Sequence, residues 1–278
     1  MSGSQPSTPQ RAGPPTSVVP GDWPGHGPAT RAPASTASLL TAEEGRPSQA
    51  SARDDDWTLS REIPIDPDHA ALLFVDVQNY NARPDGGEYT ALTEAEKDAR
   101  YGDFFRAMQQ TAVPNMQRLA NACRRARIEV MYTVIEALTQ NGRDLSLDYK
   151  ISGLFVPRGS WDAKVLDAIA PQGDEMVIPK TSSSVFISTN IDYVLRNLGV
   201  RSLIIAGVLT DQCIDSAVRD ACDLGYLVTV PNDACATLTA ERHEWALRNN
   251  RGYCRQITTE ALVQEIFTLA RDRLDSRA

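Results

Sequence analysis

Three side chains that could perform acyl-transfer chemistry stand at the ends of three apolar segments. Asp76 follows the apolar run 70–75, Cys213 follows the run 202–206 across a short turn, and Lys180 ends a third apolar segment. Continuous apolar runs of this length are typical of buried strands in a parallel sheet. Because ligands of such sheets bind at the carboxyl ends of the strands, we predict that the three side chains meet at one sheet edge.

Cys213 has the setting of a nucleophile. The residues after it predict a helix over 214–224 that Gly225 closes, which puts the thiol on the first turn. The positive potential of a helix N-terminus favours a thiolate, and its free backbone N–H groups can bind an oxyanion. Taken alone, however, a cysteine is more often a buried core thiol.

Asp76 and Lys180 give the cysteine chemical partners. A carboxylate beside a thiol can take its proton and later return it to a leaving amine. A lysine between them keeps the carboxylate ionised and favours the thiolate. Taken alone, Asp76 fits a turn and Lys180 fits a solvated surface. Together they form a Cys-Asp-Lys site that needs no histidine, and the chain has only three histidines.

The remaining pattern alternates strands with helices, which indicates an α/β layered fold with a parallel sheet. The connection 136–160 is too long for a tight turn, and such loops are usually functional. We expect strands at 70–75, 129–135, 175–178, 202–206, 226–230 and 254–257, and helices at 112–127, 161–170, 190–198, 214–224, 241–250 and 260–273.

Composition limits the class of protein. Residues 1–56 are rich in Ser, Pro, Gly and Ala without periodicity, so we expect a disordered extension before one domain over 57–278. The net charge of −8 argues against nucleic acid, and no apolar run is long enough to span a membrane. Five cysteines without a secretory signal favour a cytoplasmic location, although the Ser-rich start leaves a targeting segment open.

Three motifs carry a resemblance to a known family. They are the segments 74–79 (FVDVQN), 179–186 (PKTSSSVF) and 207–213 (GVLTDQC), with further support from 217–221 and 233–236. In this order they resemble the isochorismatase-like cysteine hydrolases, from about residue 66 to the C-terminus.

The resemblance implies a three-layer α/β/α fold with a six-stranded, mostly parallel sheet, assembled as a homo-oligomer, a dimer or a tetramer. It implies Cys213 as nucleophile, Asp76 as general base and Lys180 as their electrostatic partner. It also implies a cis peptide bond between Val208 and Leu209, which turns the amides of Leu209 and Cys213 into an oxyanion hole.

Departures from particular branches narrow the substrate. The chain lacks histidines between His69 and His243, so we expect neither the metal site of nicotinamidases nor any cofactor. Isochorismatases proper lack the cysteine. The segment 132–150 resembles the ureidoacrylate branch, where ureido and carbamoyl substrates are typical, as in N-carbamoylsarcosine amidohydrolases.

We therefore expect an amidohydrolase that releases ammonia from a small ureido or carbamoyl compound joined to a short acid, through a thioester. Arg143 or Lys150 is expected to pair with the substrate carboxylate. Two other functions remain open: an amidase for a simple amide such as maleamate, and a catalytically idle binding or scaffold protein. The alternative for Glu136 and Lys150 is that each is a solvated charge in the loop. The candidate substrate contacts are Gln78, Asn79, Glu136, Tyr149 and Lys150.

Overall fold

The structure is a computed structural model that describes residues 60–275, with side chains through residue 272. The expected extension 1–56 and the start of the domain at residue 57 lie outside the described residues.

The core of the described chain is a parallel sheet with strand order β3-β2-β1-β4-β5-β7, and a short strand, β6, pairs with β4. The α/β fold with a parallel sheet is confirmed; the sheet has seven strands where six were expected, because the two-residue β6 is too short to leave a sequence pattern. The strands are β1 (Ala70–Val75), β2 (Glu129–Ile135), β3 (Met176–Lys180), β4 (Ser202–Val208), β5 (Leu227–Pro231), β6 (Cys235–Ala236) and β7 (Arg255–Ile257).

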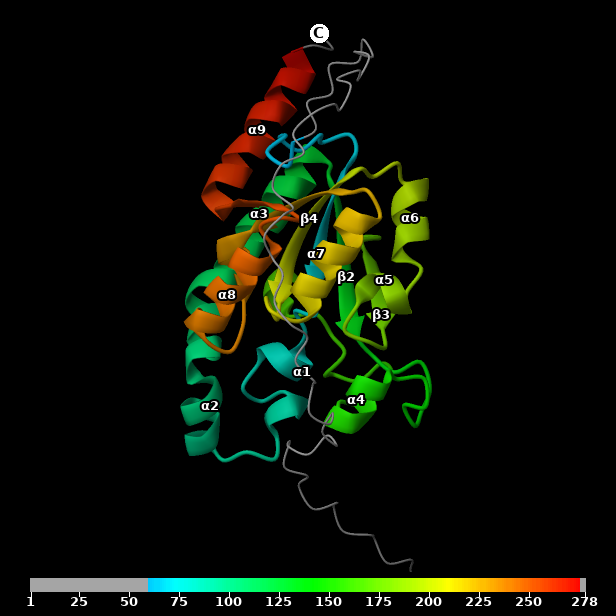
Figure 1. The fold of residues 1–278 in the computed structure, drawn as a ribbon, viewed down its shortest axis with the longest axis vertical. Coiled ribbons are helices and arrows are strands. Elements are labelled where there is room, and N and C mark those ends of the chain that lie inside the picture. Colours follow the sequence, from blue (N-terminus) through cyan, green and yellow to red (C-terminus); the bar gives the residue numbers. More distant parts are fainter. Residues whose placement is uncertain (1–59, 276–278) are drawn as a thin grey trace, which may run out of the picture. The chain divides into compact units, whose positions relative to one another are not determined.

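Helices cover both faces of the sheet, which makes three layers (Figure 1). Helix α3 (Val113–Ala126) packs against β2 and α9 (Thr259–Asp275) on one face, and α7 (Cys213–Asp223) packs against β4 and β5 on the other. Strands β1 and β4 are buried along their whole lengths because helices shield both faces. The other helices of these layers are α5 (Val185–Ser188), α6 (Ile191–Asn197) and α8 (Ala240–Asn250).

Segment 161–170 does not form the expected helix. It contains only turns and the short 3-10 helix η3 (Asp167–Ile169). Its backbone instead pairs with the segment that follows β1: the amide of Asn79 donates to the carbonyl of Lys164, and the amide of Leu166 donates to the carbonyl of Val77. These tertiary hydrogen bonds replace the intrahelical ones.

Helix α2 (Glu94–Ala107) was not expected. It continues through a π-helical turn, η2 (Met108–Ala112), into α3. A capping box does mark its start, since the Thr93 side chain accepts from the Glu96 amide and the Glu96 carboxylate accepts from the Thr93 amide. The short elements α1 (Asn79–Ala82), η1 (Gly87–Tyr89), α4 (Leu147–Ser152) and η4 (Asn232–Ala234) were also not expected.

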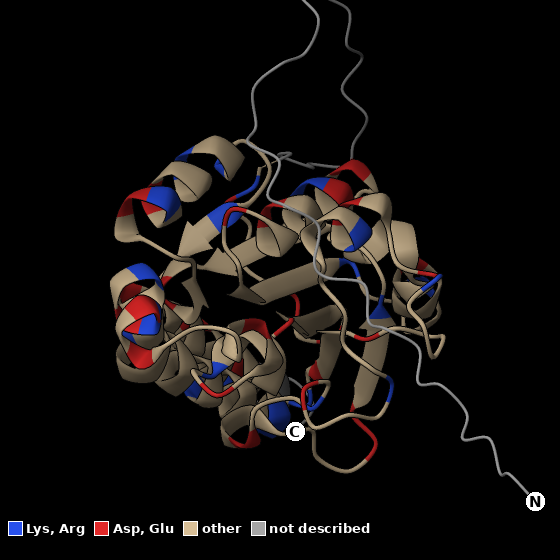
Figure 2. Cartoon of the chain, turned by 90° about the horizontal axis from the view of Figure 1, so that it is seen from below, with Lys and Arg blue, Asp and Glu red and all other residues tan. Residues whose placement is uncertain are grey.

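Charged residues of both signs lie on the outer helices and loops, and the sheet between them is largely uncharged (Figure 2). Among the described helices, none is long and apolar enough to cross a membrane.

Candidate active site

Asp76, Lys180 and Cys213 come together at the carboxyl edge of the sheet. Asp76 follows β1, Lys180 is the last residue of β3, and Cys213 is the first residue of α7, which follows β4. The Lys180 Nζ atom lies 2.8 Å from Asp76 Oδ2 and 3.5 Å from Cys213 Sγ. The strand ends thus bring the three sequence-predicted groups into contact.

The backbone at Asp76 turns sharply as the strand ends. Its φ angle of 57° lies in the left-handed region, which Asp tolerates better than most residues. The amide of Asp76 still donates to the carbonyl of Thr133 on β2, and its own carbonyl accepts from the amide of Gln78. This local turn fixes the direction of the carboxylate.

Lys180 forms the centre of the cluster. Its side chain is fully buried, and its ammonium contacts Asp76 Oδ2 at 2.8 Å, the Tyr149 hydroxyl at 2.9 Å and the Ser182 carbonyl at 2.8 Å. Burial alone would lower the pKa of Lys180, but the neighbouring Asp76 and Cys213 groups outweigh it and raise the pKa above 10.5. The lysine therefore stays positively charged.

Burial raises the pKa of the Asp76 carboxyl above its ordinary 3.8, and the Lys180 ammonium opposes this shift. A carboxylate with a raised pKa is a stronger base than one in water. Asp76 and Cys213 lie close enough for each to alter the pKa of the other.

The surroundings of Cys213 favour its protonated thiol. Burial and the nearby Asp76 carboxylate raise its pKa to about 11, while Lys180 and a hydrogen bond with Ser183 oppose this. Removal of water from the thiol thus opposes the thiolate that the helix N-terminus favours.

The turn between β4 and α7 holds the expected oxyanion groups. The peptide bond between Val208 and Leu209 is cis, where the resemblance placed one. The Leu209 carbonyl accepts from the amides of Gln212 and Ile214, and the Thr210 amide donates to the carbonyl of Ala236. These bonds hold the turn against β6, and both Leu209 and Cys213 line a cavity.

This thiol cavity has a volume of about 420 Å³, enough for a small molecule. Tyr149 lies in its wall, so this predicted contact is positioned to meet a ligand. The cavity is lined by Asn81, Glu88, Tyr89, Ile135, Asp148, Tyr149, Ser152, Leu154, Ser183, Val208, Leu209, Gln212 and Cys213.

Gln78 and Asn79 do not line the cavity. The Gln78 side chain donates to the carbonyls of Ile135 and Asp162, at 2.9 and 3.1 Å, and accepts from the amide of Ile135. The Asn79 side chain donates to the carbonyl of Trp161 at 2.9 Å. Both amides tie the loop 161–164 to the strand ends, and their role as substrate contacts stays a prediction.

Glu136 and Lys150 also lie outside the cavity wall. The Glu136 carboxylate accepts from the amide of Gly159 at 3.0 Å, and Lys150 Nζ donates to the carbonyl of Arg143 at 2.8 Å. In α4, Tyr149 is buried and Lys150 is exposed, because successive helix residues point in different directions. Both side chains hold the loop 136–160, and their role as substrate contacts stays a prediction.

Several cavity residues were not expected. Ser183 and Gln212 belong to motifs that were already apparent in the sequence, but Glu88 and Tyr89 lie in the unexpected η1, where no pattern marks them. Glu88 is open to the cavity, and the surrounding protein still removes enough water to raise its pKa to about 7, against a hydrogen bond with Tyr89.

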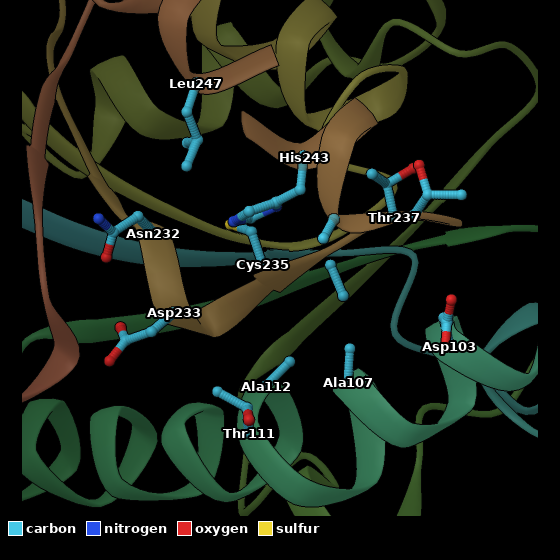
Figure 3. A pocket seen from close by; sticks show the side chains of 13 residues that line it. Asp103, Ala107, Thr111, Ala112, Asn232, Asp233, Cys235, Thr237, His243 and Leu247 are labelled. Carbon is cyan, nitrogen blue, oxygen red and sulfur yellow. The ribbon is translucent and has the colours of Figure 1, made fainter. Parts of the chain in front are cut away.

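A second cavity, of about 710 Å³, is larger than the thiol cavity, but Asp76, Lys180 and Cys213 are not among its lining residues. Figure 3 shows its wall, with His243 beside Cys235 and the α2–η2 residues opposite. His243 Nδ1 lies 2.9 Å from the Thr210 hydroxyl, and burial raises the pKa of Cys235 to about 12. The thiol, base and lysine cluster favours the smaller cavity. Within residues 60–275, three or more His, Cys, Asp or Glu side chains do not group as a metal site.

The family follows from comparison with known proteins. Residues 70–261 match the family model described as the isochorismatase domain, which is more than half of the chain. This chain belongs to the isochorismatase family. It is 29% identical over 196 residues to the ureidoacrylate amidohydrolase RutB of Agrobacterium fabrum, covering 62% of this chain and 78% of that protein. The RutB of Rhizobium rhizogenes is also 29% identical, over 62% of this chain and 72% of that protein.

Solved structures share the fold. A cysteine hydrolase from Pseudomonas syringae superposes with a TM-score of 0.63 at 24% identity, covering 74% of this chain and 96% of that one. An N-carbamoylsarcosine amidase from Thermoplasma acidophilum gives 0.52 at 21% identity, over 68% and 96%. Likeness at these identities establishes the isochorismatase-like fold, as the sequence motifs predicted.

Proposed function

We propose that this chain is a cysteine-dependent hydrolase of carbon–nitrogen bonds in linear amides, which cleaves a small ureido or carbamoyl compound and releases ammonia. The observation that carries the proposal is the contact of Lys180 with both Asp76 and Cys213 beside a cavity of substrate size. The ureidoacrylate amidohydrolases among the relatives support this reaction class.

The first half of the reaction forms a tetrahedral intermediate, which becomes a thioester when the carbon–nitrogen bond breaks. Asp76 accepts the proton of Cys213 as the sulfur attacks the substrate carbonyl carbon. The amides of Leu209 and Cys213 stabilise the negative charge on the carbonyl oxygen. Lys180 stays protonated and balances the negative charge that moves between Asp76 and the sulfur.

The second half releases both products. Asp76 gives its proton to the departing nitrogen, the carbon–nitrogen bond breaks, and ammonia or an amine leaves. Asp76 then takes a proton from water, whose oxygen attacks the thioester and restores the Cys213 thiol. If ammonia leaves a ureido group first, the acid product is a carbamate, which breaks down to carbon dioxide and a second nitrogen product.

A substrate screen tests the proposal. Ureido, carbamoyl and simple amides of equal size are compared by ammonia release at matched enzyme concentration. We expect the highest kcat/KM on a ureido or carbamoyl compound. A simple amide hydrolysed a hundredfold faster than all of these would assign the chain to the maleamate-like alternative. No turnover of any amide would favour the idle binding protein.

We also propose that the protein is a cytoplasmic homo-oligomer, a dimer or a tetramer. The five cysteines are unpaired, which suits a reducing compartment. Helix α4 supports assembly because Leu147 and Ile151, one helical turn apart, are 74% and 77% exposed. Large apolar side chains grouped in this way are typical of contact surfaces.

A further inference from the structure

The wall of the thiol cavity is acidic. It contains the carboxylates of Glu88 and Asp148, and none of the described residues that line it is a lysine or an arginine. Lys180 lies behind the wall, where Asp76 balances its charge and the Tyr149 hydroxyl and Ser182 carbonyl occupy its other donors. Above pH 7, where Glu88 is ionised, a ligand in the cavity therefore meets two carboxylates and no lysine or arginine among the described lining residues.

The two cations expected to bind a substrate carboxylate are held elsewhere. Lys150 donates to the carbonyl of Arg143, and the Arg143 guanidinium donates to the Asn141 side chain at 3.3 Å. Both are exposed and absent from the cavity wall. A carboxylate in the cavity would lose water and gain repulsion instead of a cationic partner.

The backbone that carries Glu88 is anchored on both sides. Its neighbour Tyr89 is buried, donates to the carbonyl of Asn81 at 2.8 Å and packs edge-on against Tyr101. On the other side, Gly86 lies so close to α1 that an added Cβ would be 2.1 Å from the carbonyl oxygen of Asn79. The turn that carries Glu88 is thus packed between α1 and α2 and cannot swing away without loss of these contacts.

Asp148 lines the cavity from a different segment of the chain, α4. It lies in the first turn of α4, next to Tyr149, whose hydroxyl contacts Lys180. The Ser146 side chain caps this helix by accepting from the Tyr149 amide. The two carboxylates therefore come from independent, anchored elements.

We propose that the thiol cavity selects substrates whose group beyond the scissile bond is cationic or an uncharged hydrogen-bond donor, that it rejects carboxylates, and that Glu88 determines this specificity. The inference rests on the proposed amidohydrolase function and names its substrate class. It replaces the sequence-based expectation of a short acid. Specificity of this kind arises as much from repulsion of the wrong ligand as from attraction of the right one.

Charged thiol reagents test the inference without any turnover. The 2-aminoethyl and 2-sulfonatoethyl methanethiosulfonates both form a disulfide with a thiolate and release methanesulfinate, so their rate ratio cancels the reactivity of Cys213 itself. Peptide mass spectrometry follows Cys213 alone. We expect the cationic reagent to react about tenfold faster, the lower end of electrostatic steering.

Two variants test whether the carboxylates of the cavity wall cause the difference in reaction rate between the two reagents. Glu88→Gln should reduce the cation-to-anion rate ratio severalfold, and Asp148→Asn should reduce it independently. Glu62→Gln makes the same chemical change at an exposed position before β1, at the opposite edge of the sheet, and should leave the ratio unchanged. A parent protein that reacts equally fast with the sulfonate, or an unchanged ratio in both wall variants, would overturn the inference.

Matched substrates complete the test. Propylureas that end in an ammonium, a hydroxyl or a carboxylate differ only in the remote group. We expect kcat/KM to be lowest for the carboxylate and Glu88→Gln to narrow the difference; a preferred carboxylate overturns the inference. Reagent selectivity without hydrolysis of any urea would refute the proposed function alone, whereas hydrolysis with a preference for anions would refute only the charge selection.

Discussion

At the scale of single residues, the site depends on one buried ion pair. Asp76 and Lys180 are fully buried, and their pairing compensates for the loss of water around both charges. Cys213 shares this environment and keeps its proton until Asp76 removes it. Each of the three side chains can therefore be tested by a substitution that preserves its shape.

Cys213→Ser should reduce kcat at least about a thousandfold, the scale of loss when a nucleophile is removed. A serine hydroxyl holds its proton more strongly than a thiol, and Asp76 is not basic enough to remove it. Ammonia release measures activity, and thermal unfolding checks the fold. Cys222→Ser, on the same helix but away from the cavity, is the control and should stay active.

Lys180→Met should abolish activity and lower the free energy of unfolding by about 3–5 kcal/mol, because Asp76 is left as a buried charge without its partner. Urea unfolding measures the change. The double variant Lys180→Met with Asp76→Asn removes both charges and should regain much of the stability without regaining activity. Equal stability losses in the single and double variants would contradict this account of the ion pair.

Glu88 should make the charge preference of the cavity depend on pH. Its pKa of about 7 leaves it neutral below that pH and negative above it. Tyr80 and Tyr89 are its neighbouring titratable groups, Asp148 and Tyr149 line the same cavity, and Asp162 accepts from the amide of the adjacent Gly87. The cation-to-anion reagent ratio should therefore rise severalfold from pH 6 to pH 8. Glu88→Gln should flatten the rise; a ratio that stays constant in the parent would refute it.

At the scale of elements, the sequence predicts the strands better than the connections. The limits of β1 and β2 match the expected 70–75 and 129–135, because long apolar runs bounded by polar residues have few alternatives. Segment 161–170 fails because its backbone bonds to residues distant in sequence, which no local pattern records. For the same reason, the sequence does not predict which residues of the loop 136–160 face the cavity.

Prediction of the site divides in the same way. Asp76, Lys180 and Cys213 could be found because strand ends converge at one edge of a parallel sheet. Tyr149 and Lys150 lie side by side in the sequence, yet only Tyr149 enters the cavity wall. That choice is made by the rotation of a six-residue helix that the sequence did not reveal.

At Gly207, in β4, a single added methyl group should lower the stability of the protein. Its φ angle is 131°, and an added Cβ would lie 2.2 Å from the carbonyl oxygen of Val75 on β1. Gly207→Ala should destabilise the protein by at least about 1–3 kcal/mol from backbone strain alone. Urea unfolding measures this. Gly173→Ala is a matched control: its φ is also positive, but an added Cβ meets open space, so it lacks the clash.

At the scale of the whole molecule, the exposed apolar face of α4 makes the oligomeric state testable. Leu147→Glu with Ile151→Glu should shift the mass measured by light scattering to that of a smaller species, because charges replace the exposed apolar face. Ile187→Glu, at an equally exposed apolar position on α5, is the comparison. An unchanged mass in the α4 variant and a smaller one in Ile187→Glu would move the interface to α5.

The protonated state of Cys213 also bears on oxidative damage. Peroxide attacks thiolates and spares neutral thiols, so a pKa of about 11 protects the resting sulfur from conversion to a sulfenic acid. Enzymes that keep a permanent thiolate lose activity as oxidants accumulate. Here the sulfur becomes nucleophilic only while Asp76 holds its proton. Burial of Cys213 thus has two consequences: its sulfur resists oxidation, and its reactivity depends on Asp76.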